Sequence, residues 1–509
     1  MTIKETIWQG GLCRIEKINK KMDVAAPYFT FLFLFFFVAL KASVLGLPFF
    51  WDEIVVYALP AQNLFTNGLS QIHPLFRSFP ELFFGHPPAY AFSLALAYKI
   101  FGATPLVART FTLAMACLGL GASFQLVSRL TRPWIGFLAV LLLALDPNYF
   151  SQSTQVLSDV VVMALLPVLF YLSLSEMLIL YALVASYLIL TKETALIALV
   201  AIPLARFCSQ RKLNRKEIIA YGAPILVLAL YYLDEKVFTG HFSNWPPLKS
   251  NFIHSHQEWF RNLLAQGSHM VLGKASRWPF LCAIGIGMLS LGASMILSFV
   301  FSDHLKVARA TSKWWIVGAV LMSGVFLMLG KAFLLEINEH YFIPLVPILV
   351  IGAVCLAWPL MRVSSVFPSL LVAYFVVTVQ IPLMAGGGTQ VFGIIGNANE
   401  ENMLYVNTIK VKQDALQYLH EHYPDATVDA VWPISTALQF PFVGYVSSPM
   451  HTVDGPNAKD FQVLVLADAS VPAGHQEQLK IIEAEKLELD RAFRSGNSQI
   501  QIYRKPRRP

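Results

Sequence analysis

The chain has 509 residues, of which 56% are apolar and 14% are charged, and its formal net charge is +7. Soluble domains average roughly 45–50% apolar and about 25% charged residues, so a soluble protein of this size has too little interior to hide the excess. The composition also excludes a disordered chain, a collagen-like fibre and a disulfide scaffold. We therefore predict a mainly α-helical, polytopic membrane protein.

The positive charge reflects membrane topology, because Lys and Arg occur in short patches between apolar runs. We therefore expect no nucleic-acid partner. The five cysteines are far apart in the sequence and form no CxxC pair. This spacing favours buried or cytoplasmic free thiols.

A bilayer core needs about 20 apolar residues per helix. Eleven apolar runs approach or exceed this length and are predicted to span the membrane: 27–48, 105–128, 133–149, 160–175, 177–191, 193–206, 218–233, 279–301, 314–334, 342–361 and 366–385.

Basic patches indicate the orientation. The N-terminal 26 residues and the segments 206–217 and 302–313 are rich in Lys and Arg, and they fall on one side if the eleven spans alternate. That side is the cytoplasm by the positive-inside rule, so the C-terminus is expected outside a plasma membrane. The segment 87–102 has only 16 residues and opens with two prolines, which predicts an interfacial or re-entrant helix on the outer face.

The composition changes near three consecutive glycines at 386–388, which divides the chain into a transmembrane domain (1–385) and a soluble extracytoplasmic domain (386–509). In the second domain the patterns predict a small α/β fold. Helices are expected over 414–424 and 477–493, and strands over 426–432, 461–468 and 498–505. This domain lacks glycine-rich phosphate-binding motifs, which favours a lid or a partner-docking module.

Polar motifs with catalytic residue types lie at the predicted outer ends of the spans. They are Trp51-Asp52-Glu53, His86-Pro87-Pro88, Ser158-Asp159, Thr191-Lys192-Glu193 and the segment 336–342, which contains His340 and Tyr341.

Each motif also has a structural interpretation. Trp51 suits an interface anchor, Ser158 or Asp159 suits the N-cap of a helix, and Lys192 suits a pair with Glu193. Convergence of carboxylates and cations from five separate loops on one face nevertheless favours a functional site.

Several motifs resemble the GT-C glycosyltransferases, in the subgroup of the protein O-mannosyltransferases and the lipid A aminoarabinose transferases. The similar stretches are WDEIVVYALPAQNLFTNG, HPPAYAFSLALAYKIFG, the run from ARTFTLAM to STQVLSD, LTKETALIALVAIPLA and HYFIPLVPIL. The resemblance covers about residues 30–360. It implies a multispanning helical bundle that moves a sugar from a polyprenyl-phosphate donor to an acceptor outside the cytoplasm. It also implies that Asp52 is the catalytic acid, with Glu53 as the alternative, and that Asp159 is the acid of the second loop.

The chemistry of such a donor needs one base, because a lipid phosphate leaves without a proton at neutral pH. A second carboxylic acid, as in glycoside hydrolysis, is then unnecessary. We expect Asp52 to be that base, and Lys192, His86, His340 and Tyr341 to bind the donor phosphate. Direct attack with a single base inverts the sugar configuration.

Several points stay open. Asp159 either orients the acceptor or holds a divalent metal ion, so the need for a metal cofactor is unknown. The acceptor is a glycan, a lipid or a protein, with membrane lipids as surroundings.

Two non-enzymatic alternatives are a flippase or transporter for lipid-linked sugars and a non-catalytic assembly subunit. A transporter predicts charged residues along a path inside the spans, and the apolar runs are nearly free of charge there.

Overall fold

The computed structural model describes residues 3–76, 86–240, 256–267, 313–331, 343–361, 390–391, 394–395, 403–453, 460–466, 472–496 and 498–506. The described residues before 362 form helices and short connecting segments. The α-helices are α1 (Ile3–Leu45), α2 (Leu59–Asn67), α3 (Ala89–Phe101), α4 (Pro105–Leu130), α5 (Pro133–Ala144), α6 (Pro147–Gln152), α7 (Ser158–Leu174), α8 (Leu178–Ile189), α9 (Leu196–Gln210), α10 (Arg215–Thr239), α11 (His256–Gly267), α14 (Trp315–Lys331) and α15 (Leu345–Met361). Shorter turns join them: the π-helix η1 (Glu53–Ala58) and the 3-10 helices η2 (Leu69–Ile72), η3 (Pro74–Phe76) and η5 (Glu193–Ala195).

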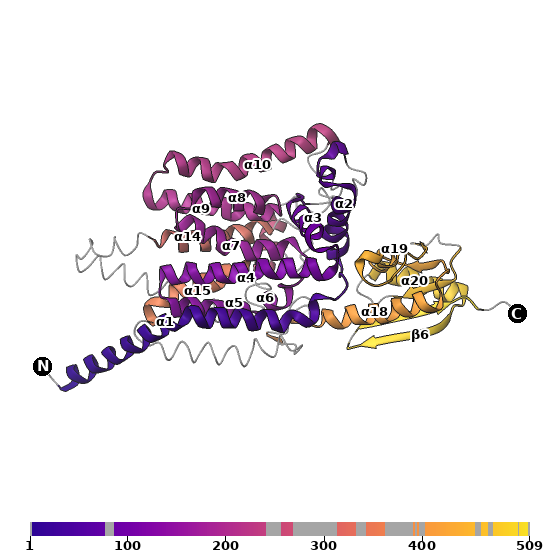
Figure 1. Ribbon diagram of the computed structural model, residues 1–509, viewed down its shortest axis with the longest axis horizontal. Helices are drawn as coiled ribbons and strands as arrows, with labels where there is room; N and C mark the ends of the chain where they lie inside the picture. Colours follow the sequence, from indigo (N-terminus) through magenta and orange to yellow (C-terminus); the bar gives the residue numbers. More distant parts are fainter. Residues whose placement is uncertain are drawn as a thin grey trace.

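The long helices form a bundle with their axes roughly parallel, and α2 and α3 lie at one end of it (Figure 1). Within the described residues, four helical stretches are long and apolar enough to cross a membrane, and six further apolar helices are shorter. The prediction of a mainly α-helical membrane protein is confirmed. Nine of the eleven predicted spans coincide with described helices, whereas 279–301 and 366–385 lie outside the described residues, so the span number stays a prediction.

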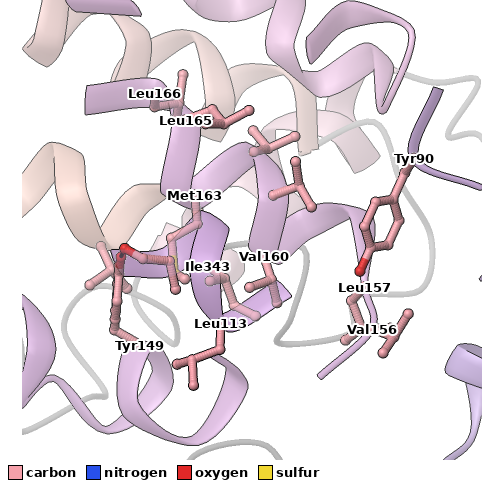
Figure 2. Close-up of a cluster of buried hydrophobic side chains, with 14 of the residues drawn as sticks. Tyr90, Leu113, Tyr149, Val156, Leu157, Val160, Met163, Leu165, Leu166 and Ile343 are labelled. Carbon is pink, nitrogen blue, oxygen red and sulfur yellow. Dashed lines mark hydrogen bonds between the residues drawn. The ribbon is translucent and has the colours of Figure 1, made fainter. Parts of the chain in front are cut away.

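A close helix contact in the bundle joins α4 and α7 and depends on a small residue. A Cβ on Gly119 would lie 2.3 Å from the carbonyl oxygen of Ala164, so only glycine permits this backbone approach. Figure 2 shows the apolar cluster beside this contact, in which Leu113 of α4 and Val160 and Met163 of α7 gather. All three are buried. This packing fixes the start of α7, where Ser158 and Asp159 lie.

The C-terminal part of the chain lies at the same end of the bundle as α2 and α3 (Figure 1). Its five-stranded sheet has the order β4-β3-β5-β7-β6; β3 pairs in parallel with β4 and β5, and β7 pairs antiparallel with β5 and β6. The strands are β3 (Val428–Ala430), β4 (Thr452–Val453), β5 (Val463–Leu466), β6 (Glu488–Ser495) and β7 (Ser498–Arg504), with the helices α18 (Tyr405–His422), α19 (Ile434–Gln439), η11 (Pro441–Val443) and α20 (Pro472–Glu485). A separate pair joins β1 (Gln390–Val391) and β2 (Ile394–Ile395).

The small α/β region is thus as expected, with one correction in its second helix. The predicted helix over 477–493 is wrong beyond Glu485, because α20 ends there and β6 begins at Glu488. Lys486 has φ +50°, a left-handed conformation that stops a helix. The residues that follow form the edge strand next to β7. The predicted boundary between residues 385 and 386 lies outside the described residues.

The contact at Gly119 generates a stability prediction. Gly119→Ala should lower the free energy of unfolding by about 1–3 kcal/mol, because the new methyl group forces α4 and α7 apart. Thermal unfolding of the detergent-solubilised protein measures the effect. Gly121→Ala is the matched control, since nothing lies within 4 Å of a Cβ there. Equal unfolding temperatures for the two variants would contradict this account of the helix contact.

Candidate functional site

A buried ion pair anchors the segment that follows α1. The Arg109 guanidinium donates to both carboxylate oxygens of Glu53, at 3.0 Å to Oε1 and 2.6 Å to Oε2. The two side chains are 0% and 1% exposed. Glu53 also accepts from the backbone N–H groups of Phe50 and Val156, each at 2.7 Å. The carboxylate is therefore fully engaged, which is what a buried ion pair needs to be tolerated.

Arg109 also connects three parts of the chain through its remaining donors. They donate to the backbone carbonyls of Leu47 and Pro48, which follow α1, and of Thr154, which precedes α7. One side chain of α4 thereby joins the ends of two other helices. Sequence reasoning missed Arg109, although a charged residue inside the apolar run 105–128 is a signal of function in a membrane protein.

In the sequence, Asp52 lies between Glu53 of this ion pair and Trp51, which has an unusual backbone geometry. Trp51 has φ +48°, a region that costs a non-glycine residue about 1–3 kcal/mol unless its surroundings enforce it. Asp52 itself is partly exposed and immediately precedes η1. Unlike Glu53, it remains accessible to a substrate.

Tyr57 of η1 connects Asp52 with the start of α7. Its hydroxyl lies 2.6 Å from the Ser158 hydroxyl. Burial raises the pKa of Tyr57 well above its usual value, and the charges of Asp159 and Asp52 raise it further. The phenol is therefore neutral, and its hydroxyl contacts the residue that precedes Asp159. Tyr57 was absent from the predicted site, because its position within an apolar segment suggests packing.

Asp159 pairs with Lys192 across two loops. Lys192 Nζ lies 2.5 Å from Asp159 Oδ2, and both side chains are nearly inaccessible. The structure distinguishes between the interpretations of these residues. Lys192 contacts Asp159, whereas the structural interpretation was a pair with Glu193. The N-cap of α7 is Leu157 and not Ser158 or Asp159, and it makes no side-chain capping bond. The structure thus brings two predicted site residues together.

His86 completes the cluster through Glu193. His86 Nδ1 lies 3.1 Å from Glu193 Oε2, and the Tyr232 hydroxyl donates to Glu193 Oε1 at 2.7 Å. The backbones of the two segments also meet, because the Ala89 N–H donates to the Leu190 carbonyl at 2.9 Å. His86 is therefore next to the loop that carries Lys192.

Four chain segments, 51–57, 86–89, 157–159 and 190–193, therefore form one connected cluster, which we call the outer cluster. His340 and Tyr341 lie outside the described residues. Among the described residues, no group of three or more His, Cys, Asp or Glu side chains gathers as a metal site. The catalytic and phosphate-binding roles of the cluster stay predictions.

Three of the four segments of the cluster, 86–89, 157–159 and 190–193, lie within the part of the chain that matches a known family, and the segment 51–57 precedes that part. Residues 85–233 match the family model described as dolichyl-phosphate-mannose-protein mannosyltransferase. No curated protein sequence matches the chain.

Two solved structures share the fold over nearly the whole length. The crystal structure of ArnT from Cupriavidus metallidurans bound to undecaprenyl phosphate is 12% identical, with a TM-score of 0.51; the apo state of the same protein is 11% identical, with a TM-score of 0.52. Each comparison covers 93% of this chain and 98% of the other. The predicted resemblance to the GT-C glycosyltransferases is confirmed.

The ion pair at Glu53 generates a second stability prediction. Arg109→Met should destabilise the protein by about 3–5 kcal/mol, because it leaves a buried carboxylate without its counter-charge. The double variant Glu53→Gln/Arg109→Met should lose less than the single one. Unfolding temperature and yield in detergent measure both. Arg129→Met, at a cation whose hydrogen bond is exposed, is the control, and an equally large loss there would refute the assignment.

Proposed function

We propose that the protein is an integral membrane glycosyltransferase that moves a sugar from a polyprenyl-phosphate carrier to an acceptor outside the cytoplasm. The family match and the shared fold support this class of enzyme. The observation that carries the site is the outer cluster, in which Tyr57, from the segment that follows Asp52, contacts Ser158 and Lys192 contacts Asp159. A phosphate-linked donor needs this combination of an accessible base and a cation.

The proposed reaction uses Asp52 as the base. Asp52 takes the proton of an acceptor hydroxyl, and the acceptor oxygen forms a bond to the anomeric carbon of the sugar. The bond between that carbon and the phosphate oxygen breaks, and its electron pair leaves with the polyprenyl phosphate. Lys192 and His86 stabilise the negative charge of the departing phosphate. A single displacement inverts the configuration of the sugar.

Asp159 and Glu53 have different roles in this proposal. Asp159 holds Lys192 in place and orients the acceptor, and no metal ion is required for either task. Glu53 fixes the backbone next to Asp52 through Arg109. The sugar is a hexose or a pentose, and the acceptor is a glycan, a lipid or a protein.

The same proposal assigns an orientation. The outer cluster and the C-terminal domain lie outside the cytoplasm of a plasma membrane, and the N-terminus lies inside. Among the alternatives, a transporter is less favoured, because the ionisable residues of the outer cluster gather where the loops meet and because residues 85–233 match a mannosyltransferase family model. An assembly subunit does not require a buried Lys192–Asp159 pair in the same cluster as the partly exposed Asp52.

The catalytic base is testable directly. The product is first identified by mass spectrometry of envelope lipids, glycans and proteins from cells with and without the gene; its rate of formation in membranes is then the assay. Asp52→Asn should lower this rate by about 10²–10⁴-fold, as loss of a general base does. Asp425→Asn, at an exposed site, is the control at matched expression. Undiminished transfer by Asp52→Asn would remove Asp52 from the role.

The phosphate-binding role of Lys192 is tested by binding alone. Lys192→Met should weaken the binding of undecaprenyl phosphate by about 10- to 150-fold, since a hydrogen bond to a charged group contributes roughly 1.5–3 kcal/mol. The double variant Asp159→Asn/Lys192→Met removes both charges of the pair, so no buried charge is left without its partner. Weaker binding in this variant is therefore due to the missing cation and not to a folding defect. Lys99→Met, at an exposed lysine, should bind normally. An unchanged dissociation constant in Lys192→Met would contradict the assignment.

A further inference from the structure

The C-terminal domain docks directly on the segment that precedes Asp52. The Phe49 N–H donates to the Val443 carbonyl at 3.1 Å, and the Phe49 ring lies 5.3 Å from that of Phe442. At Gly444, with φ +100°, an added Cβ would lie 3.3 Å from Pro48 Cα. The two backbones are thus in close contact, which a loosely tethered module would not show.

Aromatic and cationic side chains of the domain surround Trp51. The Trp432 ring lies 5.0 Å from the Trp51 ring, edge to face. Lys412 of α18 places its Nζ 5.3 Å from the Trp51 ring and 5.0 Å from the Phe50 ring. In Figure 1, α18 begins next to the end of α1, and Met403, just before it, contacts Lys41 of α1. The domain therefore packs on both the end of α1 and the segment that follows it.

The left-handed backbone at Trp51 needs such a support. A conformation of this kind persists only where the surrounding structure enforces it, and of the ring and cation contacts described for Trp51, Trp432 and Lys412 belong to the C-terminal domain. On the other side of Asp52, Glu53 is fixed by Arg109 of α4. Both sequence neighbours of Asp52 are therefore held in place, Trp51 by the C-terminal domain and Glu53 by α4 of the helical bundle.

We propose that Trp432 and Lys412 are positioning residues, which hold Trp51 and thereby direct the Asp52 carboxylate towards the acceptor. This inference rests on the proposed function, since it requires Asp52 to be the base. It gives the C-terminal domain a part in the reaction itself, beyond that of a lid or a docking module. Neither residue needs to touch the substrate.

The test uses the full-length protein with Trp432→Ala and Lys412→Met. A misplaced carboxylate should lower the transfer rate by about 10- to 100-fold, while the dissociation constant for undecaprenyl phosphate changes less than about twofold. Trp432→Phe keeps an aromatic ring against Trp51 and should restore most of the rate. Hydrogen exchange of the Phe49 amide, read by mass spectrometry of the peptide around it, should become faster in Trp432→Ala.

Matched controls separate positioning from the stability of the domain. Phe461→Ala removes a buried ring from the second apolar cluster of the domain, which includes Leu464 and Leu487, and Lys505→Met removes a lysine that lies over Phe461. Both should leave the transfer rate and the Phe49 exchange within about twofold of the parent. Equal losses in Phe461→Ala and Trp432→Ala would overturn the proposal.

A double variant distinguishes this inference from the proposed function. If Asp52 is the base, Trp432→Ala should cause no further loss in an Asp52→Asn background, because the carboxylate it positions is already absent. If Asp52→Asn abolishes transfer and Trp432→Ala has no effect, the positioning role alone is wrong. If Asp52→Asn retains full transfer, the base assignment is wrong and the positioning role falls with it.

Discussion

The buried pair of Glu53 and Arg109 is the interaction on which the rest of the site depends. It is inaccessible to solvent, and its remaining hydrogen bonds reach the segment after α1 and the loop before α7. Burying two charges is costly unless every donor and acceptor is used. The hydrogen bonds that make the buried pair tolerable also connect the segment that carries Asp52 with the loop that leads to Asp159.

The helical bundle could be predicted because lipid imposes a simple rule: a spanning helix must be apolar along its length. The runs 105–128 and 160–175 accordingly coincide with α4 and α7. In the C-terminal α/β region this rule does not apply. The stretch after Glu485 suits a helix by its local composition, but pairing with β7 makes it a strand. A neighbour distant in sequence decided that element, and local pattern contains no information about it.

The site shows the same division between local and tertiary information. The motifs at Asp52, Asp159 and Lys192 could be recognised because ionisable residues at the ends of apolar runs are conspicuous. The individual partners of these residues could not be recognised in the same way. Lys192 is adjacent to Glu193 in sequence and contacts Asp159 instead, and Tyr57 and Arg109 look like parts of apolar helices until the fold brings them to the cluster. Residue types at helix ends are readable from sequence, whereas pairing across loops requires coordinates.

The docking of the C-terminal domain has a consequence for biogenesis. The segment 48–51 is translated well before its partners in the C-terminal region, since Phe49 contacts Val443 and Trp51 contacts Trp432. Under the proposed positioning role, the segment that carries Asp52 therefore reaches its final arrangement only after residues 432–443 have been synthesised and folded against it. Insertion of the helices and the onset of activity would then be separate steps of assembly.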